Sequence, residues 1–237
     1  MRLNSRLMID AIPFWVEALF LFTCLFSLVL FYFANSKAPR LMLLLLVWCS
    51  LHALLAYQGF YQNTTSVPPR FALVLVPNAL FIIYGLIGAQ KKWFLQHRNL
   101  KLSSLFHFLR LPVEIVLYQL FLYKMVPELM TFTGRNFDIV MGLSAPLVAW
   151  LVHKKRISRK MLIAWNSIGL ALILFILVNG VLSAELPIQQ FAFDQPNRGL
   201  NYFPFILLPA LLVPMVIWMH ISDLIYLQKN KADLKSL

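Results

Sequence analysis

AIPFWVEALFLFTCLFSLVLFYFA, residues 11–34, contains a single charged side chain, the carboxylate of Glu17. A helix that crosses the hydrocarbon core of a bilayer needs about 20 mostly apolar residues. Further stretches of this kind follow, and 60% of the 237 residues are hydrophobic while only 13% are charged. Soluble domains carry about 25% charged residues, so lipid has to cover part of this surface.

The class of fold follows from these stretches. We expect an all-α membrane protein, a seven-transmembrane helix bundle that forms a single polytopic domain over residues 1–237. The fourth span is the least apolar, because it contains Pro112, Glu114 and Lys124. Without it, however, the two most basic loops would lie on opposite sides of the membrane. The expected spans are residues 11–34, 41–61, 71–89, 111–130, 137–152, 160–184 and 202–227.

Basic residues decide the orientation, because loops rich in Lys and Arg stay in the cytoplasm. Residues 90–110 and 153–160 are the most basic loops, and both lie on the same side of the expected bundle. This places the N-terminus outside and the C-terminus in the cytoplasm, and it favours the plasma (cytoplasmic) membrane. Around the first span the basic charges balance and favour neither side.

The formal net charge of +12 does not indicate a nucleic-acid partner. The charges flank the apolar stretches, as membrane topology requires, so the partner they indicate is the lipid bilayer. Cys24 and Cys49 both lie inside apolar stretches, which excludes a disulfide framework. We expect both to be small buried hydrophobic residues.

Five polar side chains form the candidate substrate-binding site. With a rise of about 1.5 Å per residue, Glu17, His52, Asn78 and Lys124 come to lie about 9–12 Å below the outer surface, on four different helices. Ionisable residues at this depth usually face the bundle interior and mark functional sites. Glu128, one helical turn after Lys124, is a candidate partner for it. The structural alternatives are an ion pair in which Lys124 reaches outward and a packing role for His52.

Residues 183–201, SAELPIQQFAFDQPNRGLN, form the longest connection on the outer side. They are too polar to span the membrane and too apolar for a free linker, so we expect them to fold back as a lid. Prolines inside the expected spans, such as Pro77 next to Asn78, free backbone carbonyls. Broken helices of this kind often line binding cavities.

A weak internal repeat runs through the chain. Phe71 and Pro77 in the third span have the same spacing as Phe203 and Pro209 in the seventh. This suggests a 3+1+3 plan of two parallel three-helix halves, which is similar in topology to sugar transporters of the SWEET type and implies a site near the midplane. The Pro-Gln turn motif of those transporters does not occur in this chain, so the similarity is one of topology.

Several chemistries lack the residues that they need. Span 202–227 contains no lysine, which excludes a retinal pigment. His52 and His220 are the histidines of the expected spans and lie at different depths, so a three-ligand zinc site is not expected. We therefore expect no catalytic residue, no metal and no cofactor, and we favour a protein that is not an enzyme.

The function that fits these residues best is a small permease or carrier for a polar solute, with its site in the outer half of the bundle. The alternative is a seven-helix sensor, ligand-binding or accessory protein that couples an outer cavity to a basic cytoplasmic face. An intramembrane enzyme is the second alternative. The expected partners are the bilayer, a small polar solute or ligand, and either a protein partner or a second copy of the chain.

Overall fold

The computed structural model describes residues 9–35, 37–87, 95 and 98–230, and the described chain is helical, without a β-strand. Its α-helices are α2 (Phe14–Ala34), α3 (Pro39–Tyr57), α4 (Ala72–Ile87), α6 (Leu100–Phe106), α7 (Arg110–Leu122), α8 (Asp138–His153), α9 (Arg159–Leu182) and α10 (Val213–Lys229). A 3₁₀ turn (His107–Leu109) joins α6 to α7, and a π-helical turn (Leu208–Leu212) leads into α10.

The helices are of the kind that crosses a membrane. Five of them, with α6–α7 counted as one continuous helix, are long and apolar enough to do so. The two shorter apolar helices cover Ala72–Leu86 and Asp138–His153. These findings confirm an all-α membrane protein.

The bounds of the fourth expected span, 111–130, are wrong. The helix runs from Leu100 to Leu122, and the Asn99 side chain caps its start by accepting a hydrogen bond from the Leu102 amide. After Leu122 the chain leaves the helix and turns with a φ of 58° at Lys124. The expected span began after Arg110, because charged residues usually mark the end of a span.

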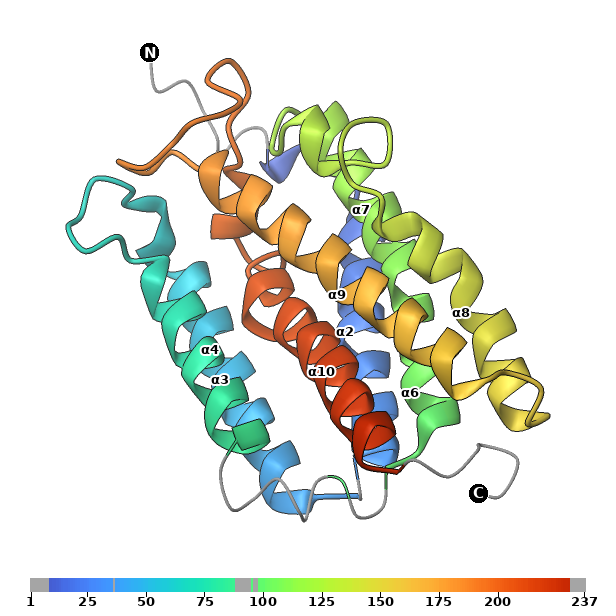
Figure 1. Cartoon of the computed structure of the whole chain (residues 1–237). Helices are drawn as coiled ribbons and strands as arrows, with labels where there is room; N and C mark the ends of the chain where they lie inside the picture. Colours follow the sequence, from blue (N-terminus) through green and yellow to red (C-terminus); the bar gives the residue numbers. More distant parts are fainter. Residues whose placement is uncertain (1–8, 36, 88–94, 96–97, 231–237) are drawn as a thin grey trace.

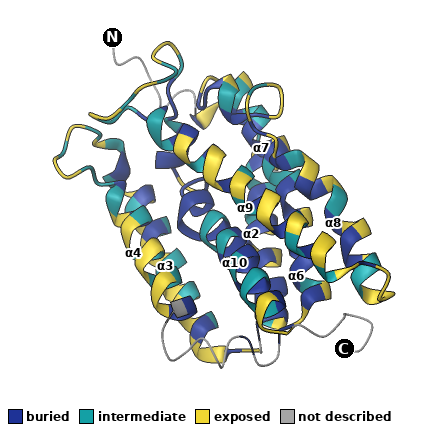
Figure 2. Cartoon of the chain, viewed as in Figure 1, coloured by how far each residue is buried: buried dark blue, intermediate teal, exposed yellow. Residues whose placement is uncertain are grey.

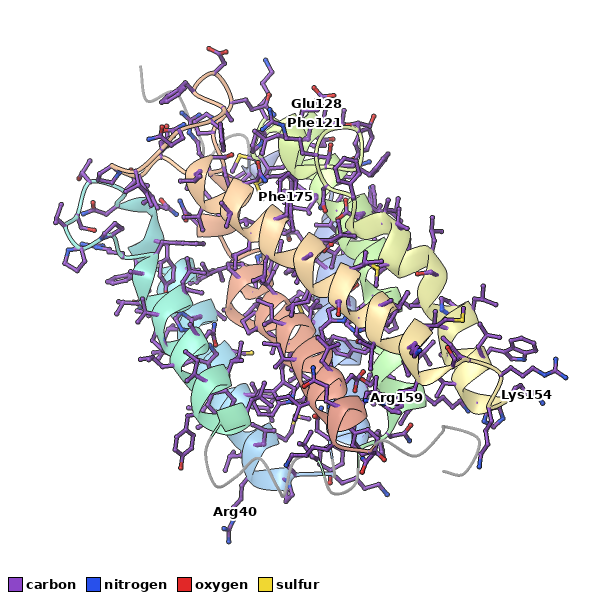
Figure 3. The ribbon with its side chains drawn as sticks, in the orientation of Figure 1. Arg40, Phe121, Glu128, Lys154, Arg159 and Phe175 are labelled. Atoms are coloured by element: carbon purple, nitrogen blue, oxygen red, sulfur yellow. The ribbon has the colours of Figure 1, made fainter. Side chains whose placement is uncertain are left out.

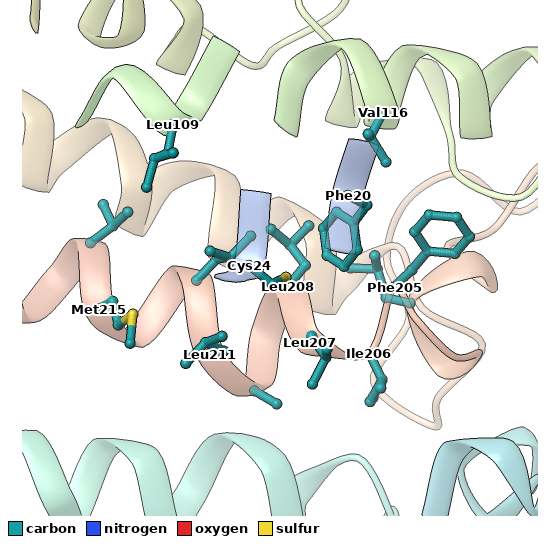
Figure 4. Close-up of a cluster of buried hydrophobic side chains, with 14 of the residues drawn as sticks. Phe20, Cys24, Leu109, Val116, Phe205, Ile206, Leu207, Leu208, Leu211 and Met215 are labelled. Carbon is teal, nitrogen blue, oxygen red and sulfur yellow. The ribbon is translucent and has the colours of Figure 1, made fainter. Parts of the chain in front are cut away.

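α10 lies at the centre of the molecule (Figure 1), and its neighbours are α9, α6 and α4. Apolar side chains from three segments meet there. Figure 4 shows members of this core: Phe20 and Cys24 from α2, Leu109 and Val116 from the α6–α7 helix, Phe205, Ile206, Leu207, Leu208 and Leu211 from the chain leading into α10, and Met215 from α10 itself. The outer faces of α4 and α9 are exposed instead, as Figure 2 shows, and α3 has few buried residues. This is the pattern expected of helices that face lipid.

α3 and α4 form a hairpin on the side of α10. Only Leu41, His52 and Ala56 of α3 are buried among its described residues. The hairpin contacts the π-helical turn, and α4 also contacts α10.

The two ends of the bundle differ in charge. Figure 3 shows Arg40, Lys154 and Arg159 at one end, which we call the basic end, and Glu128 at the other. The segment 183–201 folds back at the Glu128 end, as expected of a lid, so we call this the lid end. The lid is held there because the amides of Arg198 and Gly199 donate to the Met125 carbonyl over 2.9 and 2.7 Å.

Candidate functional site

The five residues of the expected site do not gather in one place. No hydrogen bond or ion pair joins any two of them within the described residues. Lys124 and Glu128 are exposed at the lid end, beyond the end of α7. Glu17 is half-buried in the first turn of α2.

His52 has a local partner. Its Nδ1 is hydrogen-bonded to the hydroxyl of Tyr61, in the 3₁₀ turn Phe60–Gln62 that follows α3. Burial raises the pKa of Tyr61 to about 12, so the phenol keeps its proton at neutral pH and can donate it to the imidazole. The ring of Trp48 packs edge-on against His52 at 4.1 Å. These contacts favour the packing role for His52.

Asn78 binds backbone that a proline leaves without a donor. Pro214 has no N–H, so it cannot bond the carbonyl of Ala210 as an α-helix requires, nor that of Pro209 as a π-helix requires. The Asn78 side-chain amide donates to the Pro209 carbonyl over 3.3 Å and to the Ala210 carbonyl over 3.2 Å. Trp48 Nε1 also donates to the Ala210 carbonyl, over 3.1 Å. Asn78 therefore holds α4 against the π-helical turn.

A buried polar network surrounds Arg110, in the middle of the α6–α7 helix. Its Nη1 donates to Asp138 Oδ1 of α8 over 3.0 Å, and its Nη2 donates to His220 Nε2 of α10 over 2.9 Å. The carbonyl of Gly169 in α9 lies 3.4 Å from the same Nη2. Arg110 thus connects four helices, and we call these residues, with His107, Glu114, Asn136 and Asn166, the Arg110 network.

Hydrogen bonding fixes the protonation of His220. Arg110 can only donate, so His220 Nε2 accepts and its Nδ1 carries the hydrogen. The His220 Nδ1 donates this hydrogen to Asn166 Oδ1 over 2.9 Å, and the Asn166 amide nitrogen donates to the Leu162 carbonyl. His220 is therefore neutral in this arrangement.

His107 completes this part of the network by stacking. Its ring lies flat on that of His220, with ring centroids 3.9 Å apart. A Cβ added to Gly169 would lie 2.4 Å from His220 Cε1, so α9 approaches this pair more closely than any other residue would allow. Within the described residues, no group of three or more His, Cys, Asp or Glu side chains could hold a metal ion.

A second buried network, around Arg98 at the basic end, is satisfied throughout. Arg98 pairs with Asp223 over 2.6 Å and donates to the side chains of Asn35 and Ser103 and to the Met219 carbonyl. Ser103 donates to the second Asp223 oxygen over 2.6 Å. A buried ion pair with every hydrogen bond made has a structural explanation: it fastens α2, α6 and α10 together.

The Arg110 network, in contrast, contains buried polar atoms without hydrogen-bond partners. Glu114 Oε1 accepts from the Asn136 amide, but Glu114 Oε2 has no hydrogen-bond partner among the described residues, and Arg110 Nε has none either. Glu114 is only 2% exposed. Buried polar atoms without partners are rare in folded proteins and call for an explanation.

Glu114 is one of the residues that line a cavity of about 70 Å³, which we call the chamber. Its polar wall consists of Glu114, Asn136, Asp138 and Asn197, and the rest is apolar. Asn197, a residue of the lid that is 4% exposed, donates its amide hydrogen to the Gly180 carbonyl, which leaves its Oδ1 without a partner. A smaller cavity of about 30 Å³ shares several of these walls and reaches Arg110.

An apolar groove of about 490 Å³ adjoins the chamber. It runs between α4 and α9 over α10, and its only polar lining residue within the described chain is Asn78. Pockets for small molecules commonly measure about 300–1,000 Å³. Groove and chamber share the lining residues Leu177, Val181, Pro209 and Val213.

The site expected from the sequence did not include Arg110, Asp138, His107, Asn136 or Asn197. A signal for part of the set was present, since His107, Arg110 and Glu114 have the spacing of one helix face. Asn99, a residue type that favours helix N-caps, marked where that helix begins. No sequence signal connected them to Asn136 and Asn197, which loops bring to the chamber.

Residues 68–228 match the family described as Domain of unknown function (DUF8737). The match covers more than half of the chain, and the protein belongs to this family. No curated protein and no solved structure matches the chain. The matched region contains the whole Arg110 network, the chamber and the groove, whereas Glu17 and His52 precede it.

Proposed function

We propose that this protein binds an amphipathic small molecule from within the bilayer. The hydrocarbon part occupies the groove between α4 and α9, and the polar part lies in the chamber beside Glu114 and Asn197. The observation that carries the proposal is the pairing of a lipid-facing apolar groove with a chamber whose lining residues Glu114 and Asn197 carry unpartnered, buried polar atoms. The function is thus that of a membrane-embedded ligand-binding protein, such as a sensor or an accessory protein.

The proposal places all seven apolar helices across the bilayer, with the lid end outside and the basic end in the cytoplasm. Two of the basic residues used for orientation, Arg98 and Arg110, are buried and carry no topological information. Lys91 and Lys92 lie outside the described residues. The remaining basic residues of that side support the assignment, since Arg40, Lys154 and Arg159 share one end (Figure 3).

Cysteine accessibility tests this topology. In a chain with Cys24→Ala and Cys49→Ala, Thr65→Cys and Asp194→Cys should react with a membrane-impermeant maleimide added to whole cells. Lys154→Cys should react only after the membrane is opened. All three side chains are exposed in the structure, so unequal labelling reports the side of the membrane. Reaction of the Lys154→Cys variant in intact cells would reverse the orientation.

Photolabelling tests the binding site. A dodecyl chain that carries a diazirine near its end should label groove residues of α4 and α9 in protein reconstituted in phosphatidylcholine nanodiscs. Val178→Trp, at an exposed position that lines the groove, should reduce this labelling. Ile168→Trp is the matched control, because Ile168 lies on the same helix, is about equally exposed (57% against 55%) and does not line the groove. Equal labelling of both variants would contradict the proposal.

A carrier for the same class of molecule is the second candidate. It is favoured by two irregular turns beside the cavities, since Leu208 and Pro209 of the π-helical turn line the chamber and the 3₁₀ turn contributes Leu109 to the smaller cavity. In phosphatidylcholine vesicles, a dithionite-sensitive fluorescent dodecyl probe should then change leaflets faster with the protein than without it. Equal rates of leaflet exchange with and without the protein would contradict the carrier function and leave only the binding function.

A further inference from the structure

The chamber also limits the chemistry of the head group. This inference rests on the proposed function, because it concerns the polar part of the same ligand. Three charged side chains lie in or beside the chamber: Glu114, Asp138 and Arg110. Arg110 is paired with Asp138, and within the described part of the chain no ion pair reaches Glu114.

The two histidines of the network do not supply a second cation. His220 uses Nε2 as an acceptor for Arg110, so it is neutral. A charged imidazole has two N–H donors to satisfy, and neither nitrogen of His107 has a hydrogen-bond partner. The chamber thus holds two carboxyl groups against one guanidinium.

Two residues that line the chamber carry an oxygen without a partner in the described chain, and both oxygens are acceptors once Glu114 is ionised. The Asn136 amide holds Glu114 Oε1, which leaves Oε2 free. The Gly180 carbonyl fixes the Asn197 amide by accepting its hydrogen, so the free atom must be Oδ1 and not the nitrogen. With Glu114 ionised, a ligand that satisfies both oxygens donates two hydrogen bonds.

We infer that the ligand is an amphipathic amine, whose protonated primary or secondary amino group donates to Glu114 Oε2 and to Asn197 Oδ1. A buried carboxyl group without a cation keeps its proton, so Glu114 is neutral while the chamber is empty. A neutral amine that enters takes up this proton, and the ammonium group formed then supplies the positive charge for the Glu114 carboxylate and two donors at once. A hydroxyl group supplies a single donor and no charge, and a carboxylate supplies neither. A chamber of about 70 Å³ has room for such a small head group.

Competition for the photolabel compares head groups on one dodecyl chain. Dodecylamine should displace the dodecyl diazirine at concentrations about tenfold or more below those of dodecanol, because charge-assisted hydrogen bonds are the stronger ones. Laurate should be the weakest. Dodecyltrimethylammonium is a cation without N–H groups, so it distinguishes the effect of charge from the effect of hydrogen-bond donors. It should compete less well than the amine. Empty nanodiscs correct for partition into lipid.

A variant locates the preference. Glu114→Gln keeps an oxygen for the Asn136 amide and removes the charge, so the advantage of dodecylamine over dodecanol should fall about tenfold. Glu128→Gln is the matched control, an exposed carboxylate at the same end of the bundle, and should leave that advantage unchanged. The comparison of head groups on the unaltered protein needs no variant and stands even where Glu114→Gln does not fold.

The outcomes separate the two proposals. Groove labelling that all four competitors displace equally would overturn the amine assignment and leave the binding function standing. A Glu114→Gln protein that folds and keeps the full preference for the amine would also overturn it. If the diazirine does not label the groove at all, the proposed function itself is wrong.

Discussion

Arg110 is the residue that most changes the view of this bundle. A guanidinium in the middle of a membrane helix is costly, and it is found where partners compensate it. Here Asp138, His220 and the Gly169 carbonyl do so, each from a different helix. Because these partners are remote in sequence, the chain alone gave no reason to place Arg110 inside a span. The same is true of Asp138, which follows a loop and begins α8.

Removing one partner of this pair should be worse than removing both. Arg110→Met leaves Asp138 as a buried charge without a cation, which we expect to lower the free energy of unfolding by about 3–5 kcal/mol. Adding Asp138→Leu should recover more than half of that loss, because no isolated charge remains. Equilibrium unfolding of both single variants and the double variant, in mixed dodecylmaltoside and SDS micelles, measures the coupling. Losses that simply add would show that the two side chains act independently.

Among the helices, those bounded by clear charge or turn signals were predicted well. The expected spans 137–152 and 160–184 correspond to Asp138–His153 and Arg159–Leu182. The predicted bounds of the fourth span were displaced because the polar residues of this helix face the interior of the bundle. Their periodicity indicates one helix face, whereas their charge indicates the end of a span. The expected 3+1+3 repeat stays a prediction. Prolines inside the expected spans indicated broken helices, and the π-helical turn before Pro214 is one of them. The residues of α3 and α4 that bond this turn could not be derived from the sequence.

Asn78 and Trp48 should stabilise the protein by bonding the carbonyls of that broken helix. Asn78→Leu removes the donor to the carbonyls of Pro209 and Ala210, and we expect it to cost about 1–3 kcal/mol of stability. Pro214→Ala in the same chain should recover part of the loss, because the alanine N–H can bond the Ala210 carbonyl. SDS-induced unfolding checks both variants. If Pro214→Ala brings no more recovery in the Asn78→Leu chain than it brings alone, Asn78 does not act by this route.

At the scale of the whole molecule, the arrangement of the helices was beyond reach of the sequence. Nearly every helix is apolar on all sides, and a helix of that kind does not reveal which face meets protein and which meets lipid. The structure makes α10 and the chain before it central, and leaves α3 at the periphery. Composition identified the membrane class, but burial decides which leucines carry the stability.

Two leucines of the same size should therefore respond very differently. Leu211, 2% exposed, lies in the core around the π-helical turn, and Leu211→Ala should cost about 2–5 kcal/mol. Leu43 on α3 is 63% exposed, and Leu43→Ala should stay within about 0.5 kcal/mol of the parent protein. Thermal unfolding in one detergent compares the pair. A similar loss at both positions would mean that α3 is covered by protein and not by lipid.

The attachment of the α3–α4 hairpin has a mechanical consequence. Trp48 and Asn78 fasten it to two neighbouring carbonyls, those of Pro209 and Ala210, near the middle of its length. A lever held near its middle rocks: when one arm moves outward, the other moves inward. Rocking of this hairpin would widen the groove toward one face of the bilayer while narrowing it toward the other. On the other side of α10, the Arg98 contacts join it to α6 and to the end of α2.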